Sequence, residues 1–233
     1  MARLEWVFLD IGGVLVDDDP LHEAMIKELR EVLASSGKDM DLETVRREFV
    51  DYFLRTPGAM SRGFILTHIE DEGKALKAID EFRRVIFPLF PRLYALRPEA
   101  NGVLDALKER YKLGIIANQP ASTRDFLQVT GLEARFDFII LSGEVDLTKP
   151  DPRIFQLALS KAGCGPGACV MVGDRIDADI APSKKLGMRT VRVVNGLFAG
   201  QRARVPEEMP DAEIASIEML PDALRTLEEK GLI

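Results

Sequence analysis

Short runs of apolar residues recur along the chain and predict the strands of a buried sheet. They stand at residues 6–9, 113–117, 138–141, 169–172 and 190–194. Short runs dominated by apolar residues are typical of parallel strands covered on both faces. Segments with helical apolar spacing lie between the later runs, at 98–108, 121–129, 152–162 and 179–186. This alternation predicts βαβ units and an α/β fold built on a doubly wound parallel sheet.

The segment between the first run and the next strand–helix unit follows a different pattern, without a convincing strand. Its apolar residues have helical spacing at 21–33, 41–54, 64–69 and 74–87. Proline and glycine separate these stretches. We therefore predict an α-helical domain at 17–95, inserted into a core domain made of 1–16 and 96–233. Because ligands bind at the carboxyl ends of parallel strands, this insertion is expected to form a cap over the site, with a separate accessory domain as the alternative.

Composition narrows the class of protein. The chain has 233 residues, 46% of them hydrophobic, and a net charge of -7. The negative charge argues against a nucleic-acid partner. No apolar run approaches the about 18 residues of a membrane span, and no leader pattern stands at the start. Two cysteines, Cys164 and Cys169, lack metal-ligand spacing, so we expect a cytoplasmic protein with no membrane partner.

Asp10 is the first candidate for chemistry. It ends the first apolar run and precedes Gly12 and Gly13. A carboxylate in this position can act as a nucleophile, a metal ligand or both, and the glycines allow a sharp turn close to a ligand. From this segment alone, a strand-end aspartate that caps a loop is an equal alternative.

Polar residues also follow the other predicted strands. They are Asn118, Lys149, Asp174 and Asp179. The carboxyl ends of parallel strands meet at one edge of a sheet, so these side chains are expected to gather near Asp10. Clustered carboxylates repel each other unless a cation lies among them, and surroundings rich in oxygen and free of histidine suit Mg²⁺.

The order of these motifs resembles that of the haloacid dehalogenase-like hydrolase superfamily, in the helical-cap branch (C1, subfamily I). Asp10 matches the nucleophile of the first motif, and Lys149 with the following Pro-Asp-Pro matches the third. Gly173-Asp174 with Asp179 matches the acidic fourth motif. The resemblance covers nearly the whole chain and implies a Rossmann-like core with a cap at 17–95.

The resemblance also implies roles for these residues. Asp10 would attack phosphorus and form an aspartyl-phosphate, while Lys149 would neutralise the nucleophile and the transferring group. Asn118, together with Lys149, would bind phosphate. The implied Mg²⁺ ligands are Asp10, the backbone carbonyl of Gly12, Asp174 and Asp179, the last directly or through water.

Two positions depart from the family pattern. Gly12 stands where the phosphatases usually carry a general acid, and Ala117 stands where motif two usually ends in Ser or Thr. We expect a Mg²⁺-dependent phosphoric monoester hydrolase, of low activity if nothing replaces these groups, acting on a small phosphorylated metabolite as a monomer or homodimer. One alternative is a weakly active or non-catalytic binding or regulatory protein. A 2-haloacid dehalogenase is a second alternative, disfavoured because metal-free dehalogenases do not need the pair Asp174 and Asp179.

A further acidic run lies at the entry to the insertion. Residues 17–19 are all aspartate, and we interpret them as a hinge and a helix-start cap, with an extra metal site as the minor alternative. His22 and His68 are interpreted as surface or packing residues of the insertion.

Overall fold

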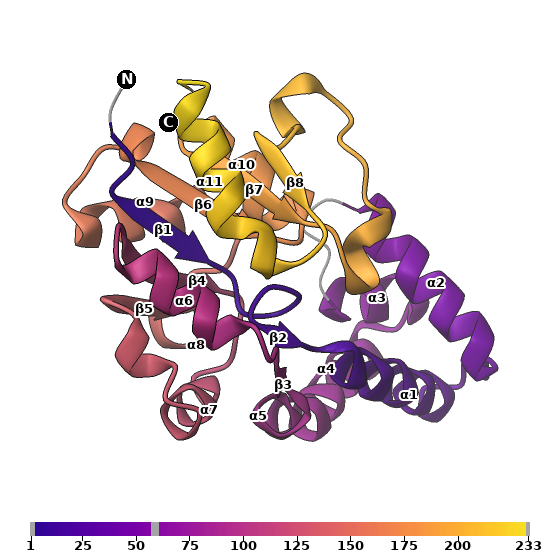
Figure 1. Cartoon of the computed structure of the whole chain (residues 1–233). Coiled ribbons are helices and arrows are strands. Elements are labelled where there is room, and N and C mark those ends of the chain that lie inside the picture. Colours follow the sequence, from indigo (N-terminus) through magenta and orange to yellow (C-terminus); the bar gives the residue numbers. More distant parts are fainter. Residues whose placement is uncertain (1–2, 57–60, 232–233) are drawn as a thin grey trace. The chain divides into compact units, whose positions relative to one another are not determined.

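The computed structural model describes residues 3–56 and 61–231 (Figure 1). The chain divides into two compact units. One consists of Met1–Asp17 and Ala95–Ile233, and the other of Asp18–Tyr94.

The first unit is built on a six-stranded sheet in which every neighbouring pair is parallel. The strand order is β5-β4-β1-β6-β7-β8. The strands are β1 (Trp6–Leu9), β4 (Lys112–Ala117), β5 (Phe138–Leu141), β6 (Cys169–Gly173), β7 (Arg189–Val193) and β8 (Ala212–Ile214). The chain builds outward from β1 on one side and then returns to build on the other, which confirms the doubly wound sheet predicted from the apolar runs.

The core explains why these runs become strands. All four residues of β1 and all five of β6 are buried. Trp6 and Phe8 pack on one face with residues of α9 (Pro152–Ala162), including Ile154 and Phe155. Helices lie on both sides of the sheet (Figure 1), among them α6 (Ala100–Lys108) and α11 (Leu220–Glu229).

Local signals set the helix ends. The carboxylate of Asp151 accepts a hydrogen bond from the backbone N–H of Arg153 at the start of α9, and Gly163 ends that helix in the left-handed region. The predicted helix at 179–186 differs from the structure. A π-helical turn, Ile176–Ile180, precedes a short α10, Ala181–Lys185. Such turns are rare and occur frequently at functional sites.

The regular elements of the second unit, in its described part, are all helices, as its spacing predicts. Its α-helices are α1 (Asp19–Ser35), α2 (Leu42–Arg55), α3 (Ser61–His68), α4 (Glu72–Ile86) and α5 (Phe90–Leu93). Asp41 and Asp71 cap α2 and α4 by accepting backbone N–H groups of Thr44 and Lys74. The role of this unit as a cap stays a prediction.

Two short strands that the sequence pattern does not reveal flank the insertion. β2 (Val16–Asp17) pairs antiparallel with β3 (Ala95–Leu96). The backbone N–H of Arg97 also donates to the carbonyl of Leu15 at 3.0 Å. Strands of two residues have no period to detect, which is why they were not predicted.

Among the described residues, no helix is both long and apolar enough to cross a membrane.

Candidate active site

Asp10 lies directly beyond the carboxyl end of β1. Its backbone N–H donates to the carbonyl of Val172 at 2.9 Å, so the pairing with β6 extends one residue past the strand. Its Oδ1 accepts a hydrogen bond from the backbone N–H of Ile11 at 2.8 Å. The chain then turns back through Gly12, which forms an isolated bridge with Val16. The Asp10 carboxylate is therefore held in a defined orientation by its own turn.

Lys149 connects two of the predicted acids. Its Nζ lies 3.1 Å from Oδ1 of Asp10 and 2.5 Å from Oδ1 of Asp179, and its side chain is only 1% exposed. Burial alone lowers the pKa of Lys149, but the charges of Asp10 and Asp179 and their hydrogen bonds outweigh it and raise that pKa. The lysine is therefore a permanent cation at neutral pH.

Asn118 holds the backbone of Lys149. Its Nδ2 donates to the Lys149 carbonyl at 2.9 Å, and its Oδ1 accepts the Lys149 N–H at 2.8 Å. The amide thus pairs with one residue as a neighbouring strand would. This positioning role was missed by sequence reasoning, because nothing in the sequence pairs an asparagine with a backbone 31 residues away. The role of Asn118 in phosphate binding stays a prediction.

Asp179 is the most enclosed of the three acids. It is fully buried, and its Oδ2 accepts the backbone N–H of Arg175 at 3.1 Å while Oδ1 contacts Lys149. Burial raises the pKa of Asp179, against the lowering effect of the Lys149 ammonium. A Cβ on Gly173 would overlap with the Asp179 side chain, so the glycine of motif four makes room for this acid.

Asp174 completes the group. It is 5% exposed, and a Cβ on Gly13 would lie 2.6 Å from its Oδ2. Gly13 has a φ of +66°, which also favours glycine. Ligand atoms of Asp10, Asp174 and Asp179 all lie within 4.8 Å of one another. The structure therefore brings three carboxylates and one ammonium to the edge where the sequence predicts them.

The two departures from the family motifs are visible at the same edge. Gly12 lies in the turn after Asp10 and has no side chain to donate a proton. Ala117 is the buried last residue of β4 and offers only a methyl group. The metal-ligand role of the Gly12 carbonyl stays a prediction.

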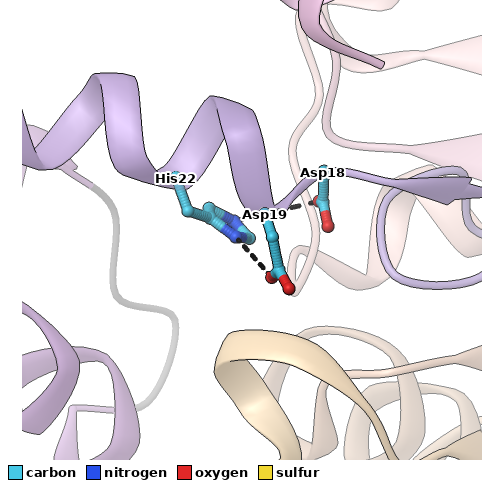
Figure 2. A group of neighbouring side chains, drawn as sticks. All are labelled: Asp18, Asp19 and His22. Carbon is cyan, nitrogen blue, oxygen red and sulfur yellow. Dashed lines mark ion pairs between the residues drawn. The ribbon is translucent and has the colours of Figure 1, made fainter. Parts of the chain in front are cut away.

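A second acidic group lies in the other unit, at the start of α1 (Figure 2). His22 is 3.8 Å from Asp18 through Nε2 and 3.9 Å from Asp19 through Nδ1. Asp18 occupies the N-cap position, but its side chain makes no capping hydrogen bond, so the prediction of a helix-start cap is wrong in its mechanism. His22 lies beside both carboxylates, on the first turn of α1.

His68 is a packing residue, in agreement with its interpretation from the sequence. Its Nε2 lies 2.9 Å from Oε2 of Glu48 on α2, and its Nδ1 lies 2.8 Å from the Phe64 carbonyl on α3. The ring therefore ties two helices of the second unit together.

Comparison with known proteins places this geometry in a family. The sequence profile of haloacid dehalogenase-like hydrolases matches residues 4–187. A phosphoserine phosphatase of Thermus thermophilus is 34% identical over 64% of this chain, and the alignment spans 59% of that relative. A glyceraldehyde 3-phosphate phosphatase of Pyrococcus furiosus is 26% identical, over 99% of this chain and 96% of its own length.

A solved structure shows the same likeness. A 2-haloacid dehalogenase of Pseudomonas syringae superposes with a TM-score of 0.61 at 26% identity, covering 96% of this chain and 99% of that one. Overall similarity thus does not separate phosphatase from dehalogenase, and the choice depends on the site. With its matched residues and its parallel sheet, the chain belongs to the haloacid dehalogenase-like hydrolase family.

Proposed function

We propose that this protein is a Mg²⁺-dependent phosphatase that hydrolyses a small phosphorylated metabolite. The observation that carries the proposal is the buried Lys149, placed between Asp10 and Asp179 with Asp174 beside them. Lys149 alone does not offset the charge of three carboxylates. An anionic phosphoryl group can therefore bind beside the nucleophile only if a second cation is present. The phosphatases among the relatives support this reading.

The donor set fits Mg²⁺. All three clustered ligand residues offer carboxylate oxygens, and the group contains no histidine or cysteine. Asp10 and Asp174 would hold the ion, with the Gly12 carbonyl, and with Asp179 directly or through water. Both Asp179 oxygens already accept hydrogen bonds, from Lys149 and from the Arg175 backbone, which favours contact through water. Bound Mg²⁺ would offset the negative charge of the phosphoryl oxygens.

The residues of the chain supply the remaining chemistry. The Asp10 carboxylate attacks phosphorus, an Asp10 O–P bond forms, and the bond from phosphorus to the leaving oxygen breaks. Water then attacks the phosphorus of this acyl phosphate, releasing phosphate and restoring the carboxylate. Lys149 offsets charge on Asp10 and on the transferring group, and Ile11 holds the carboxylate through its N–H. Since Gly12 cannot donate a proton, the leaving oxygen must depart as an anion or take its proton from water.

A dehalogenase is the second candidate, and the likeness to the Pseudomonas syringae enzyme favours it. Asp10 would then displace halide from carbon, for which the absence of an acid at Gly12 is no handicap. Asp174 and Asp179 argue against this chemistry, because clustered acids around the nucleophile would repel a substrate carboxylate unless metal is bound.

One screen separates these functions. The purified chain is incubated with a panel of phosphate esters and with 2-haloacids, each with Mg²⁺ and with a chelator. We expect phosphate release that requires Mg²⁺ and no halide release. Metal-independent halide release would identify a dehalogenase. If no compound is turned over, the alternative of a non-catalytic binding or regulatory protein is favoured.

A further inference from the structure

Arg192 is a charged residue inside the sheet. It lies on β7, and its side chain is 2% exposed. Its guanidinium donates to three backbone carbonyls: Asp174 at 3.2 Å, Phe198 at 2.8 Å and Gln201 at 3.2 Å. Its carboxylate partner is Glu213, at 3.1 Å, whose side chain is 53% exposed. Most of its bonds therefore serve the backbone rather than an ion pair.

Such an arrangement needs a reason, because burying a charge is costly unless it is well bonded. The carbonyls come from two separate segments. One is the turn that follows β6 at Asp174, and the other runs from the 3₁₀ helix Gly196–Gly200 to Gln201. The rigid fork of the guanidinium joins these segments at fixed spacing, which a lysine could not reproduce.

Gln201 joins the same segments a second time. It is 5% exposed. Its Oε1 accepts the backbone N–H of Ile176 at 2.8 Å, and its Nε2 donates to Oδ1 of Asp177 at 2.7 Å. The Arg175 guanidinium also lies over the Phe198 ring, 4.7 Å from its centre. The turn after β6 is thus tied to the segment after β7 through its backbone and its side chains.

This turn carries two of the three clustered acids. Asp174 stands at its start, and Asp179 follows in the π-helical turn. We infer that Arg192 and Gln201 are positioning residues that hold this turn, and with it the Asp174 carboxylate, in the geometry that binds the divalent cation. Neither side chain is placed among the ligands. The inference rests on the proposed function, since it concerns the same metal site.

Calorimetric titration with Mg²⁺ tests the inference without an activity assay. Arg192→Met and Gln201→Ala should each weaken Mg²⁺ binding by about tenfold or more, as loss of outer partners does at other metal sites. Arg192→Lys should also weaken it, since one ammonium cannot serve three carbonyls. Turnover should show a raised KM for Mg²⁺, with kcat largely recovered at saturating ion. If the two residues were purely structural, the variants would melt at a lower temperature but bind Mg²⁺ with the same dissociation constant as wild type.

Asp211→Asn is the matched control. Asp211 accepts hydrogen bonds from the N–H of Thr190, also on β7, at 2.8 Å and from Lys184 at 3.0 Å. The Asp211→Asn substitution should lower the stability of the fold and leave the affinity for Mg²⁺ unchanged. If Arg192→Met does not fold, Gln201→Ala decides.

The outcomes separate the inference from the proposed function. A wild-type protein that binds Mg²⁺ while folded Arg192→Lys and Gln201→Ala bind it equally well would overturn the inference alone. A wild-type protein that binds no Mg²⁺ would overturn both.

Discussion

The Nζ of Lys149 lies 3.1 Å from Oδ1 of Asp10, within a site where the lysine side chain is 1% exposed. Charges this poorly solvated interact more strongly than at a surface. The lysine therefore offsets the charge of the proposed nucleophile. Because it also contacts the buried Asp179, it contributes to the stability of the fold as well.

Replacing Lys149 should damage both stability and turnover. Lys149→Met leaves the carboxylates of Asp10 and Asp179 unbalanced, with an expected loss of about 3–5 kcal/mol in unfolding free energy. At saturating Mg²⁺, kcat should fall by about 10²–10³. Denaturant unfolding and steady-state kinetics measure the two effects. The exposed Lys161→Met on α9 is the control, and an equal result for both variants would contradict the role of Lys149.

A side chain at Gly13 should disturb the site in two ways, by straining the backbone and by pushing against Asp174. Gly13→Ala places a Cβ 2.6 Å from Oδ2 of Asp174, at a φ of +66°. Gly131→Ala is a matched control, with a φ of +72° and nothing within 4 Å of the new Cβ. Both variants should lose about 1 kcal/mol or more through backbone strain. Only Gly13→Ala should also weaken Mg²⁺ binding in a calorimetric titration, and unchanged binding would show that Asp174 is not a ligand.

The central strands were predictable because their apolar runs, such as those of β1 and β6, are buried on both faces of the sheet. Lys149, Asp174 and Asp179 were predictable as a group because they follow strand ends and match known motifs. The contacts that individual site residues make were harder to predict. Asn118 and Arg192 act through backbone carbonyls of distant segments, and no sequence period reports such partners.

Other structural features could not be predicted from the sequence, for physical reasons. β2 and β3 have two residues each, too few for a pattern. In the π-helical turn Ile176–Ile180 apolar and acidic residues alternate, so the predicted helix begins only at 179. The extra residue of the turn appears only when the hydrogen bonds to the Arg175 carbonyl are known. Arg192 stands between Val191 and Val193, and nothing in that pattern indicates that its charged side chain is buried.

Substrate preference should follow the missing acid. With Gly12 in place, kcat/KM should fall steeply as the leaving-group pKa rises, so acyl, anomeric and aryl phosphates should react faster than alkyl phosphates. A general acid contributes about 10²–10⁴-fold to rate. Gly12→Asp should therefore flatten this dependence and raise rates on alkyl esters. A flat dependence in the wild-type protein would show that another group already donates the proton.

The docking of α11 should weaken at high pH. The Tyr111 hydroxyl donates to Oε1 of Glu228 at 2.9 Å, and burial together with this bond raises the pKa of Tyr111 to about 12. A pKa raised by folding means that the neutral hydroxyl stabilises the fold below pH 10 and that this contribution is lost as pH rises toward 12. Tyr111→Phe should cost about 1 kcal/mol at pH 8. Its difference from wild type in denaturant unfolding should shrink over that window, and a constant difference would refute the assignment.

The most direct test of the proposed function is Asp10→Asn. The amide keeps the size of the side chain and removes the attacking charge, so the melting temperature should change little while phosphate release falls to background. Wild type should release phosphate only when Mg²⁺ is present. Turnover that survives in folded Asp10→Asn would contradict the account, as would wild-type turnover that a chelator leaves unchanged.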